Sequence, residues 1–337
     1  MDSNGLYIAM VVDPDGHLLD TITDGDIRRA ILGGVSLDSP VAVLRDRRGS
    51  MYPTPVTAPE GISRTAMAAL MAAKQVRHLP IVDPTGRLTR VVTLAEVSTH
   101  DEVPLEAVIM AGGYGTRLKP LTNDVPKPML PVGEKPLLEH MVSQLKTAGI
   151  KSLSVTTHYK KELITEHFKD GSDFGIAINY VEEDAPLGTA GALSLIKRPD
   201  GPLLVINGDV LTRIDFGAML SFHREHQAEM TVGIRKFETL VPFGVVERDG
   251  VDITGITEKP VITQFISGGI YLMNPDALQL IPERKPYDMP ELLNALISSG
   301  KRVVGFPIRE YWLDIGRVED YEKAQEEIAA MDESSYE

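Results

Sequence analysis

Short apolar runs alternate with helical patterns through residues 106–325. Runs bounded by turn residues predict strands at Ala107–Ala111, Leu153–Thr157, Ile176–Val181, Leu203–Asn207 and Met230–Ile234. Apolar residues at every third or fourth position predict helices at Leu137–Thr147, Lys161–Phe168 and Phe216–His226. This alternation predicts an α/β sandwich with a mainly parallel sheet. Ligands of such sheets bind beyond the carboxyl ends of the strands, so we expect functional side chains just after the strands.

The composition narrows the classes of protein to which the chain can belong. The absence of cysteine excludes disulfides, thiolate nucleophiles and cysteine metal sites, and it is typical of the cytoplasm. The net charge of −14 argues against a partner nucleic acid or anionic membrane, either of which calls for a basic face. No apolar run approaches the roughly 18 residues that span a bilayer. A phosphate ligand remains compatible, because it needs only a local basic pocket.

A repeat with an offset of 70 residues fills the first hundred positions. Val12-Asp13-Pro14 returns as Val82-Asp83-Pro84, and the match continues through a glycine, a leucine and a threonine. Each copy predicts a strand, an Asp-Pro-x-Gly turn, a second strand and a helix that begins at the threonine. Thr23 with Asp26, like its counterpart in the second copy, fits a helix capping box.

This repeat resembles a pair of cystathionine-β-synthase (CBS) domains, above all in the segment Val76-Arg77-His78-Leu79-Pro80-Ile81-Val82-Asp83. The resemblance implies an α+β CBS pair in residues 1–103, which often dimerises and often binds an adenine nucleotide. In that family a Thr/Ser-x-x-Asp element holds the ribose, so Thr23 and Asp26 become a candidate regulatory site. The simple helix cap stays open as the alternative. The first copy has no counterpart of the segment Pro55–Lys74, so either this copy is abbreviated or the sequence lacks its beginning.

A glycine-rich loop follows the first predicted strand of the larger region, after a linker at Asp101–Pro104. It reads Met110-Ala111-Gly112-Gly113-Tyr114-Gly115-Thr116-Arg117-Leu118. Glycines let backbone N–H groups approach a phosphate, and an arginine can neutralise it. The spacing matches neither a dinucleotide-binding loop nor a Walker loop. Ten residues after Arg117, Pro126-Lys127-Pro128 holds a lysine on a stiffened backbone, which suits a triphosphate.

Together these two motifs resemble the sugar-phosphate nucleotidylyltransferases, which include mannose-1-phosphate guanylyltransferases and glucose-1-phosphate uridylyl- and thymidylyltransferases. The resemblance implies a Rossmann-like nucleotidyltransferase sandwich in residues 104–330. It also implies transfer of a nucleotidyl group to a sugar 1-phosphate, with release of pyrophosphate. Arg117 and Lys127 would then hold the nucleotide phosphates. The remaining nucleotide-binding positions of the loop are Ala111, Gly112, Gly113, Gly115 and Thr116.

Two aspartates provide a candidate Mg²⁺ site. Asp209 ends Asn207-Gly208-Asp209 after an apolar strand, and the family binds Mg²⁺ with the matching aspartate. Asp314, in Trp312-Leu313-Asp314-Ile315-Gly316, supplies a second carboxylate. Two carboxylates with phosphate oxygens and waters suit Mg²⁺, which rarely takes an all-protein cage. Helix capping is the alternative role for a strand-end aspartate.

The sugar side of the site is predicted from two further motifs. Glu258-Lys259-Pro260 matches the family's Glu-Lys-Pro element, in which Glu258 contacts a sugar hydroxyl and Lys259 the sugar phosphate. Gly269, in Ser267-Gly268-Gly269-Ile270-Tyr271, marks the adjoining sugar-side strand. Because the family more often has Ser or Ala at position 268, mannose, glucosamine and heptose phosphates all stay open.

Glu183 carries the prediction of the base. It lies five residues before Gly188, where uridylyl and thymidylyl enzymes commonly have glutamine. A carboxylate only accepts hydrogen bonds, and guanine offers adjacent N1–H and N2–H₂ donors. GTP is therefore favoured over UTP, dTTP and CTP, which remain alternatives.

A non-catalytic regulatory subunit is the rival from another class. Such subunits lose basic or metal residues, whereas Arg117, Lys127, Asp209 and Asp314 are all present, so we favour an enzyme. His223 and His226, with polar neighbours, predict a solvated helix face.

Overall fold

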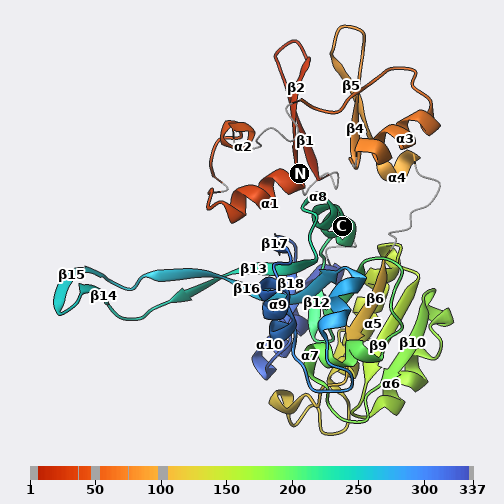
Figure 1. The fold of residues 1–337 in the computed structure, drawn as a ribbon, viewed down its shortest axis with the longest axis vertical. Coiled ribbons are helices and arrows are strands. Elements are labelled where there is room, and N and C mark those ends of the chain that lie inside the picture. The colour runs from red at the N-terminus through yellow and green to blue at the C-terminus, as the bar shows by residue number, and fades with distance from the viewer. Residues whose placement is uncertain (1–6, 37, 47–53, 75, 98–104, 334–337) are drawn as a thin grey trace. The chain divides into compact units, whose positions relative to one another are not determined.

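The computed structural model describes residues 7–36, 38–46, 54–74, 76–97 and 105–333 (Figure 1). The chain divides into two compact units, one of residues 1–103 with 216–222 and one of residues 104–215 with 223–337. The predicted linker Asp101–Pro104 lies outside the described residues.

The first unit contains both copies of the repeat. The first copy comprises β1 (Ile8–Val12), β2 (Leu18–Thr23), α1 (Asp24–Leu32) and α2 (Ala42–Asp46). The second copy comprises β3 (Ala58–Pro59), α3 (Arg64–Lys74), β4 (His78–Val82), β5 (Leu88–Thr93) and α4 (Leu94–Val97). Ile8 pairs with Thr23 in one hairpin and His78 pairs with Thr93 in the other, with an irregularity at the same place in each ladder. The two copies of the sequence repeat therefore pair their strands in the same register.

The turns of the two hairpins bind one another. Leu18 N–H donates to the Gly86 carbonyl at 3.1 Å, and Leu88 N–H donates to the Gly16 carbonyl at 3.0 Å. Both glycines have positive φ, 88° and 89°, which side chains rarely adopt. This reciprocal exchange relates the hairpins by an approximate two-fold axis.

The second unit is built on a seven-stranded sheet in the order β10-β9-β6-β11-β16-β13-β17. The strands are β6 (Glu106–Met110), β9 (Ser152–Thr157), β10 (Ala177–Glu182), β11 (Leu203–Asn207), β13 (Met230–Leu240), β16 (Val261–Met273) and β17 (Val303–Pro307). Only β16 runs antiparallel to its neighbours in this sheet. The predicted mainly parallel α/β sheet is confirmed.

Helices and short ladders complete this unit. The helices of residues 105–333 are α5 (Leu137–Thr147), α6 (Lys161–Phe168), α7 (Gly188–Gly191), α8 (Phe216–Glu225), α9 (Met289–Ser298) and α10 (Val318–Glu333). Short 3₁₀ helices span Thr116–Leu118, Lys127–Met129, Ser172–Phe174, Ala192–Leu195 and Pro275–Leu280. Two-stranded ladders join β7 (Pro131–Val132) to β8 (Lys135–Pro136) and β12 (Val210–Thr212) to β18 (Trp312–Asp314). Buried apolar side chains of β11, β13, β16 and α9 form one core cluster, including Val205, Met230, Met273 and Leu292.

Two strands of the sheet continue beyond it into a long hairpin (Figure 1). β13 and β16 stay paired from Arg235 opposite Ile266 to Leu240 opposite Val261. The tip is the hairpin of β14 (Val245–Asp249) and β15 (Asp252–Thr257). β17 follows β13 only as far as Ile234. We call residues 235–266 the arm.

One helix-face prediction is wrong. His223 on α8 is 2% exposed, not solvated. Its Nδ1 lies 2.9 Å from Thr231 Oγ1 and its Nε2 lies 3.2 Å from Asn274 Oδ1. Burial lowers the pKa of this imidazole, so the ring is a neutral part of the core.

Candidate active site

The glycine-rich loop begins where two parallel strands end side by side. β6 and β11 pair in register, with Met110 opposite Asn207. Gly208 N–H then donates to the Met110 carbonyl at 2.9 Å, and a Cβ on Gly208 would lie 2.6 Å from that oxygen. Glycine is therefore required at 208, and Ala111 is held beside the turn that carries Asp209. Two of the predicted site segments therefore lie together at the carboxyl ends of adjacent parallel strands.

Two glycines of the loop lie close to their surroundings. A Cβ on Gly112 would lie 2.3 Å from Glu183 Oε1. Gly115 has φ 63°, and its carbonyl accepts a 2.8 Å hydrogen bond from Thr122 Oγ1. A Cβ on Gly113 would meet no atom within 4 Å. The loop is thus held near both ends, and the space beside Gly113 is open to a ligand.

Lys127 and Asp209 form the closest ion pair of the site. Lys127 Nζ donates to Asp209 Oδ2 at 2.6 Å, and the side chains are 12% and 25% exposed. The two residues are 82 positions apart in the sequence. The second carboxylate oxygen, Asp209 Oδ1, is buried and has no hydrogen-bond partner among the described residues.

A short ladder brings Asp314 to Asp209. Val210 of β12 lies opposite Asp314 of β18, and Ile315 N–H donates to the Asp209 carbonyl at 2.9 Å. Partial burial of the carboxyl group and the charge of Asp209 raise the pKa of Asp314 to about 6, while Lys127 and Arg117 act in the opposite direction. The predicted cations and carboxylates therefore meet in one place.

The residues present fit a divalent cation. A buried carboxylate oxygen without a partner is costly unless a donor or a cation completes it. The negative charge of Asp209 raises the pKa of Asp314, and a positive ion held by both carboxylates would relieve this repulsion. Oxygen donors of this kind are those that Mg²⁺ prefers. Asp209 and Asp314 are thus the residues that would hold it.

Glu183 lies against the start of the glycine loop. The residue is 8% exposed, and its Oε2 accepts a 2.9 Å hydrogen bond from Leu187 N–H, just before Gly188. Its Oε1 faces Gly112. Gly188 has φ 78°, and a Cβ there would lie 2.5 Å from Asp288 Oδ1. One carboxylate oxygen of Glu183 therefore stabilises the turn at Leu187, and the other lies against the glycine-rich loop at Gly112.

His158 is a neighbour of this site that the sequence interpretation missed. Its Nδ1 donates to the Glu183 carbonyl at 2.7 Å, and its Nε2 lies 3.0 Å from the Tyr114 hydroxyl. It therefore ties the middle of the glycine loop to the segment that carries Glu183. The signal was its position directly after β9, the same signal that identified Asp209.

The predicted sugar-side residues separate into two groups. Gly269 lies at the site, where a Cβ would be 2.9 Å from Asn207 Nδ2. Glu258 and Lys259 lie in the arm and are exposed. A Cβ on Gly244, also in the arm, would be 3.0 Å from Glu258 Oε2. The structure does not bring Glu258 and Lys259 together with Asp209 of their own chain.

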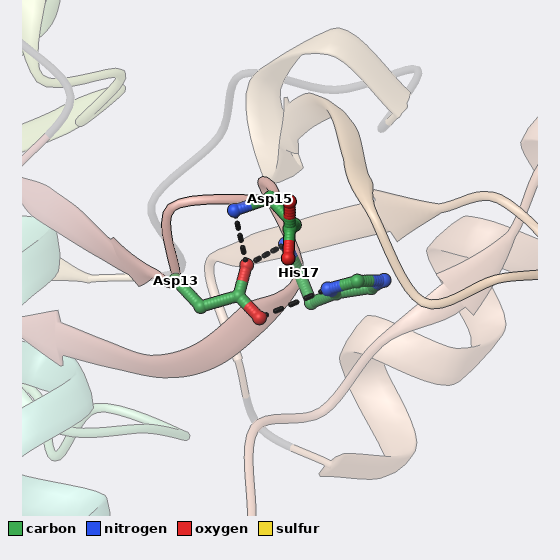
Figure 2. Close-up of side chains that lie close together, drawn as sticks. All are labelled: Asp13, Asp15 and His17. Atoms are coloured by element: carbon green, nitrogen blue, oxygen red, sulfur yellow. Dashed lines mark hydrogen bonds and ion pairs between the residues drawn. The ribbon is translucent and has the colours of Figure 1, made fainter.

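Two polar clusters of the first unit have structural roles. Thr23 caps α1, and the Asp26 carboxylate accepts hydrogen bonds from the Thr23 N–H and hydroxyl at 2.8 and 2.7 Å. Asp13, Asp15 and His17 lie close together (Figure 2). Asp13 Oδ1 accepts from the backbone of the other two, as Asp83 Oδ1 accepts from Thr85 and Arg87 in the second copy. Because the second turn closes without a histidine, turn closure alone accounts for Asp13.

The sequence model of the family described as "Nucleotidyl transferase" matches residues 106–331. The chain belongs to the nucleotidyl transferase family. The "CBS domain" model matches residues 49–101, which include the complete second copy of the repeat.

Curated relatives match the same region. The chain is 34% identical over 227 residues to a mannose-1-phosphate guanyltransferase of Schizosaccharomyces pombe, covering 64% of this chain and 62% of the relative. It is 34% identical over 240 residues to a mannose-1-phosphate guanylyltransferase of Mycobacterium tuberculosis, covering 69% and 66%. The chain thus spans less than two thirds of the length of these relatives.

Solved structures share the architecture of the nucleotidyl transferase region. HddC from Yersinia pseudotuberculosis, complexed with GMP-PN, superposes with a TM-score of 0.52 at 26% identity, covering 66% of this chain and 99% of that chain. A UDP-glucose pyrophosphorylase complexed with UDP-glucose gives 0.52 at 22% identity, covering 67% and 98%. Among the described helices, none has the length and apolar character to cross a membrane.

Proposed function

We propose that this nucleotidyl transferase family member transfers GMP from GTP to a sugar 1-phosphate, giving a GDP-sugar and pyrophosphate. The observation that carries the proposal is the meeting of Lys127, Asp209 and Asp314 at the end of the glycine-rich loop. Cations and carboxylates of this kind suit a triphosphate with its metal. No other catalytic group is required.

The proposed reaction is an in-line displacement at the α-phosphorus of the nucleotide. A phosphate oxygen of the sugar 1-phosphate forms the new P–O bond, and the bond to the bridging oxygen of pyrophosphate breaks. The nucleophile arrives ionised, so no general base is needed. The chain's residues position the two phosphates and neutralise their charge, with Arg117 and Lys127 on the nucleotide.

Mg²⁺ is the proposed cofactor, held by Asp209 and Asp314. When bound, it supplies charge neutralisation of the triphosphate and of the leaving pyrophosphate. Asp209 Oδ1, which has no hydrogen-bond partner among the described residues, supports this assignment. Lys127 holds the other oxygen of the same carboxylate and thereby orients it.

Guanine is the proposed base and mannose 1-phosphate the first sugar phosphate to test. Glu183 Oε1 faces the glycine loop, where an acceptor-only group would select guanine over a pyrimidine. Two relatives are named for mannose-1-phosphate guanylyl transfer, and one structural neighbour holds a guanine nucleotide analogue. UTP and dTTP remain the alternatives if Glu183 only stabilises the turn at Leu187 and does not bind the base.

We also propose that the boundary between the modules falls at residues 103–104 and that the CBS pair binds a nucleotide and alters transfer. Support for the regulatory role comes from the domain match and the Thr23–Asp26 element. A cytoplasmic location and a homo-oligomer stay predictions.

The test of the proposed function is a panel of nucleoside triphosphates against several sugar 1-phosphates, with pyrophosphate release as the readout. GTP with mannose 1-phosphate should react fastest. Pyrophosphate release with a pyrimidine nucleotide alone would overturn the base assignment. No release with any pair would overturn the function.

A further inference from the structure

The arm, residues 235–266, concentrates the exposed apolar surface of the described chain. Eleven of the twenty exposed large hydrophobic residues lie in it. They include Phe243 at 72%, Ile253 at 73% and Val251 at 97% exposure. Single exposed apolar residues are common, but a concentrated set marks an interaction surface.

Both faces of the arm carry such residues. Phe237 and Ile262 belong to neighbouring cross-strand pairs on one face, and Leu240 lies opposite Val261 on the other. Both strand edges are unpaired within the described chain, because β17 ends its pairing at Ile234 and β11 at Ile270. A two-stranded ribbon without a third strand or a covering layer is marginal in water. The arm therefore requires something to pack against.

The arm also separates two predicted sugar-phosphate residues from their own site. From Ser267 to Val261 the ladder runs without a shift in register. Six residues of strand span about 20 Å, and Glu258 and Lys259 lie beyond that point. Side chains reach only a fraction of this distance. In this conformation each body has Asp209, Asp314 and Gly269 but lacks the Glu-Lys pair.

We propose that the arm packs on a second copy of this chain and delivers Glu258 and Lys259 to the partner's active site. This inference rests on the proposed function. The argument for a second copy is complementarity: the arm carries the two residues that the body lacks, and every copy has one of each. Reciprocal exchange about a two-fold axis satisfies both copies at once. It also covers the apolar residues of both arms.

The first test is complementation between two defective chains. Asp209→Asn disables the body, and Glu258→Gln with Lys259→Ala disables the arm. The two chains are co-expressed with different tags, and the mixed dimer is isolated. If arms are exchanged, the mixed dimer has one complete site and recovers about half of the wild-type rate. If each arm serves its own body, neither site is complete and the mixed dimer stays as inactive as its parents, which would overturn the proposal.

The second test needs no catalysis. The chain has no cysteine, so Lys259→Cys with Arg317→Cys introduces the only two thiols. Arg317 follows Gly316, whose Cβ position lies 3.7 Å from Asp314 Oδ1. A short bis-maleimide should link the full-length chains into covalent dimers, and each single-cysteine variant is the control. A link within one chain, or no link, would contradict arm exchange.

These readouts separate the two proposals. An active wild-type enzyme without complementation or intermolecular links keeps the proposed function and rejects arm exchange. Intermolecular links in a protein with no transfer activity keep the exchanged arm and reject the function. Capture of a different protein by the arm, with no links between copies, rejects the second copy as the partner.

Discussion

Asp209 has two different oxygens, and the difference explains how it can serve a metal. Oδ2 accepts from Lys127 at 2.6 Å, which fixes the carboxylate. Oδ1 is buried and partnerless among the described residues. An uncompensated buried acceptor costs about 1–3 kcal/mol, so it persists where a ligand completes it. This arrangement is the one that the proposed Mg²⁺ site requires.

Replacing Asp209 by Asn should lower turnover about 100-fold or more while the chain stays folded, because the shape remains and the charge is lost. The measurement is pyrophosphate release at saturating Mg²⁺, together with a thermal unfolding curve. Asp249→Asn in the arm's tip removes a carboxylate outside the site and serves as the control. Near-normal turnover in the Asp209→Asn variant would contradict the assignment of Asp209 as a metal ligand.

The raised pKa of Asp314 predicts how Mg²⁺ binding depends on pH. The carboxyl has a pKa of about 6 without metal, so below that pH a proton occupies the group that the metal needs. Apparent Mg²⁺ affinity should therefore be constant above about pH 7 and fall by up to tenfold per pH unit below about pH 6. Calorimetric titration of the full chain at pH 7.5 and 5.0 checks this. Equal affinity at both values would contradict the role of Asp314.

Glu183→Gln tests the choice of base. Glutamine keeps an acceptor for Leu187 N–H but turns one oxygen into a donor, so it should lose about 1–3 kcal/mol for GTP, or about 5- to 150-fold in kcat/KM. The adjacent Glu182→Gln is the matched control, since that side chain is 62% exposed and pairs with Lys161. A wild-type enzyme that prefers UTP or dTTP would show that the base argument is wrong.

At the scale of elements, we expect the loop after β6 to couple phosphate binding to base choice. Gly112→Ala places a methyl group 2.3 Å from Glu183 Oε1, so the carboxylate must move. Because that group ends a flexible side chain, we expect unfolding to change by less than about 1 kcal/mol, while the ratio of GTP to UTP kcat/KM falls about tenfold. Gly113→Ala, which meets no atom, should keep the wild-type ratio. Similar ratios in both variants would contradict the coupling.

The sequence predicts correctly those helices whose bounds depend on apolar periodicity and on the turns beside them. The helices Leu137–Thr147 and Lys161–Phe168 were predicted with their observed bounds, because their apolar periodicity and flanking turns coincide. The strand predicted at Met230–Ile234 continues to Leu240, since beyond the sheet it pairs with β16 rather than with a buried layer. The polar sequence neighbours of His223 predict a solvated side chain. In the structure Thr231 and Asn274, which belong to other segments of the chain, hydrogen-bond to its buried ring.

The sequence predicts those parts of the candidate site that lie directly after a strand of the sheet. Asp209 and the glycine loop come from adjacent parallel strands, so their meeting was predictable. Asp314 reaches them through a ladder between segments about a hundred residues apart, and only the resemblance to a family indicated it. The position of Glu258 and Lys259 depends on how far β13 and β16 extend, which no local motif encodes.

At the scale of the whole molecule, a nucleotide on the CBS pair should change the transferase rate. Coupling of about 1–3 kcal/mol would appear as a 5- to 150-fold change in the affinity for GTP. The measurement is titration of the full chain with AMP, ADP and ATP, following binding and rate together. Nucleotide binding without a change in transferase rate would indicate that the CBS pair is a docking module and not a regulator. No binding would leave Thr23 and Asp26 as the helix cap that the structure contains.

The central claim is that the chain moves a nucleotidyl group, and the most direct measurement follows that group. GTP labelled at the α-phosphate is incubated with mannose 1-phosphate, Mg²⁺ and the enzyme, and the products are separated. The account predicts that the label moves into a GDP-sugar, with one pyrophosphate released for each, and that Asp209→Asn abolishes both. Label that remains in GTP, or that appears only in GMP or GDP, would contradict it.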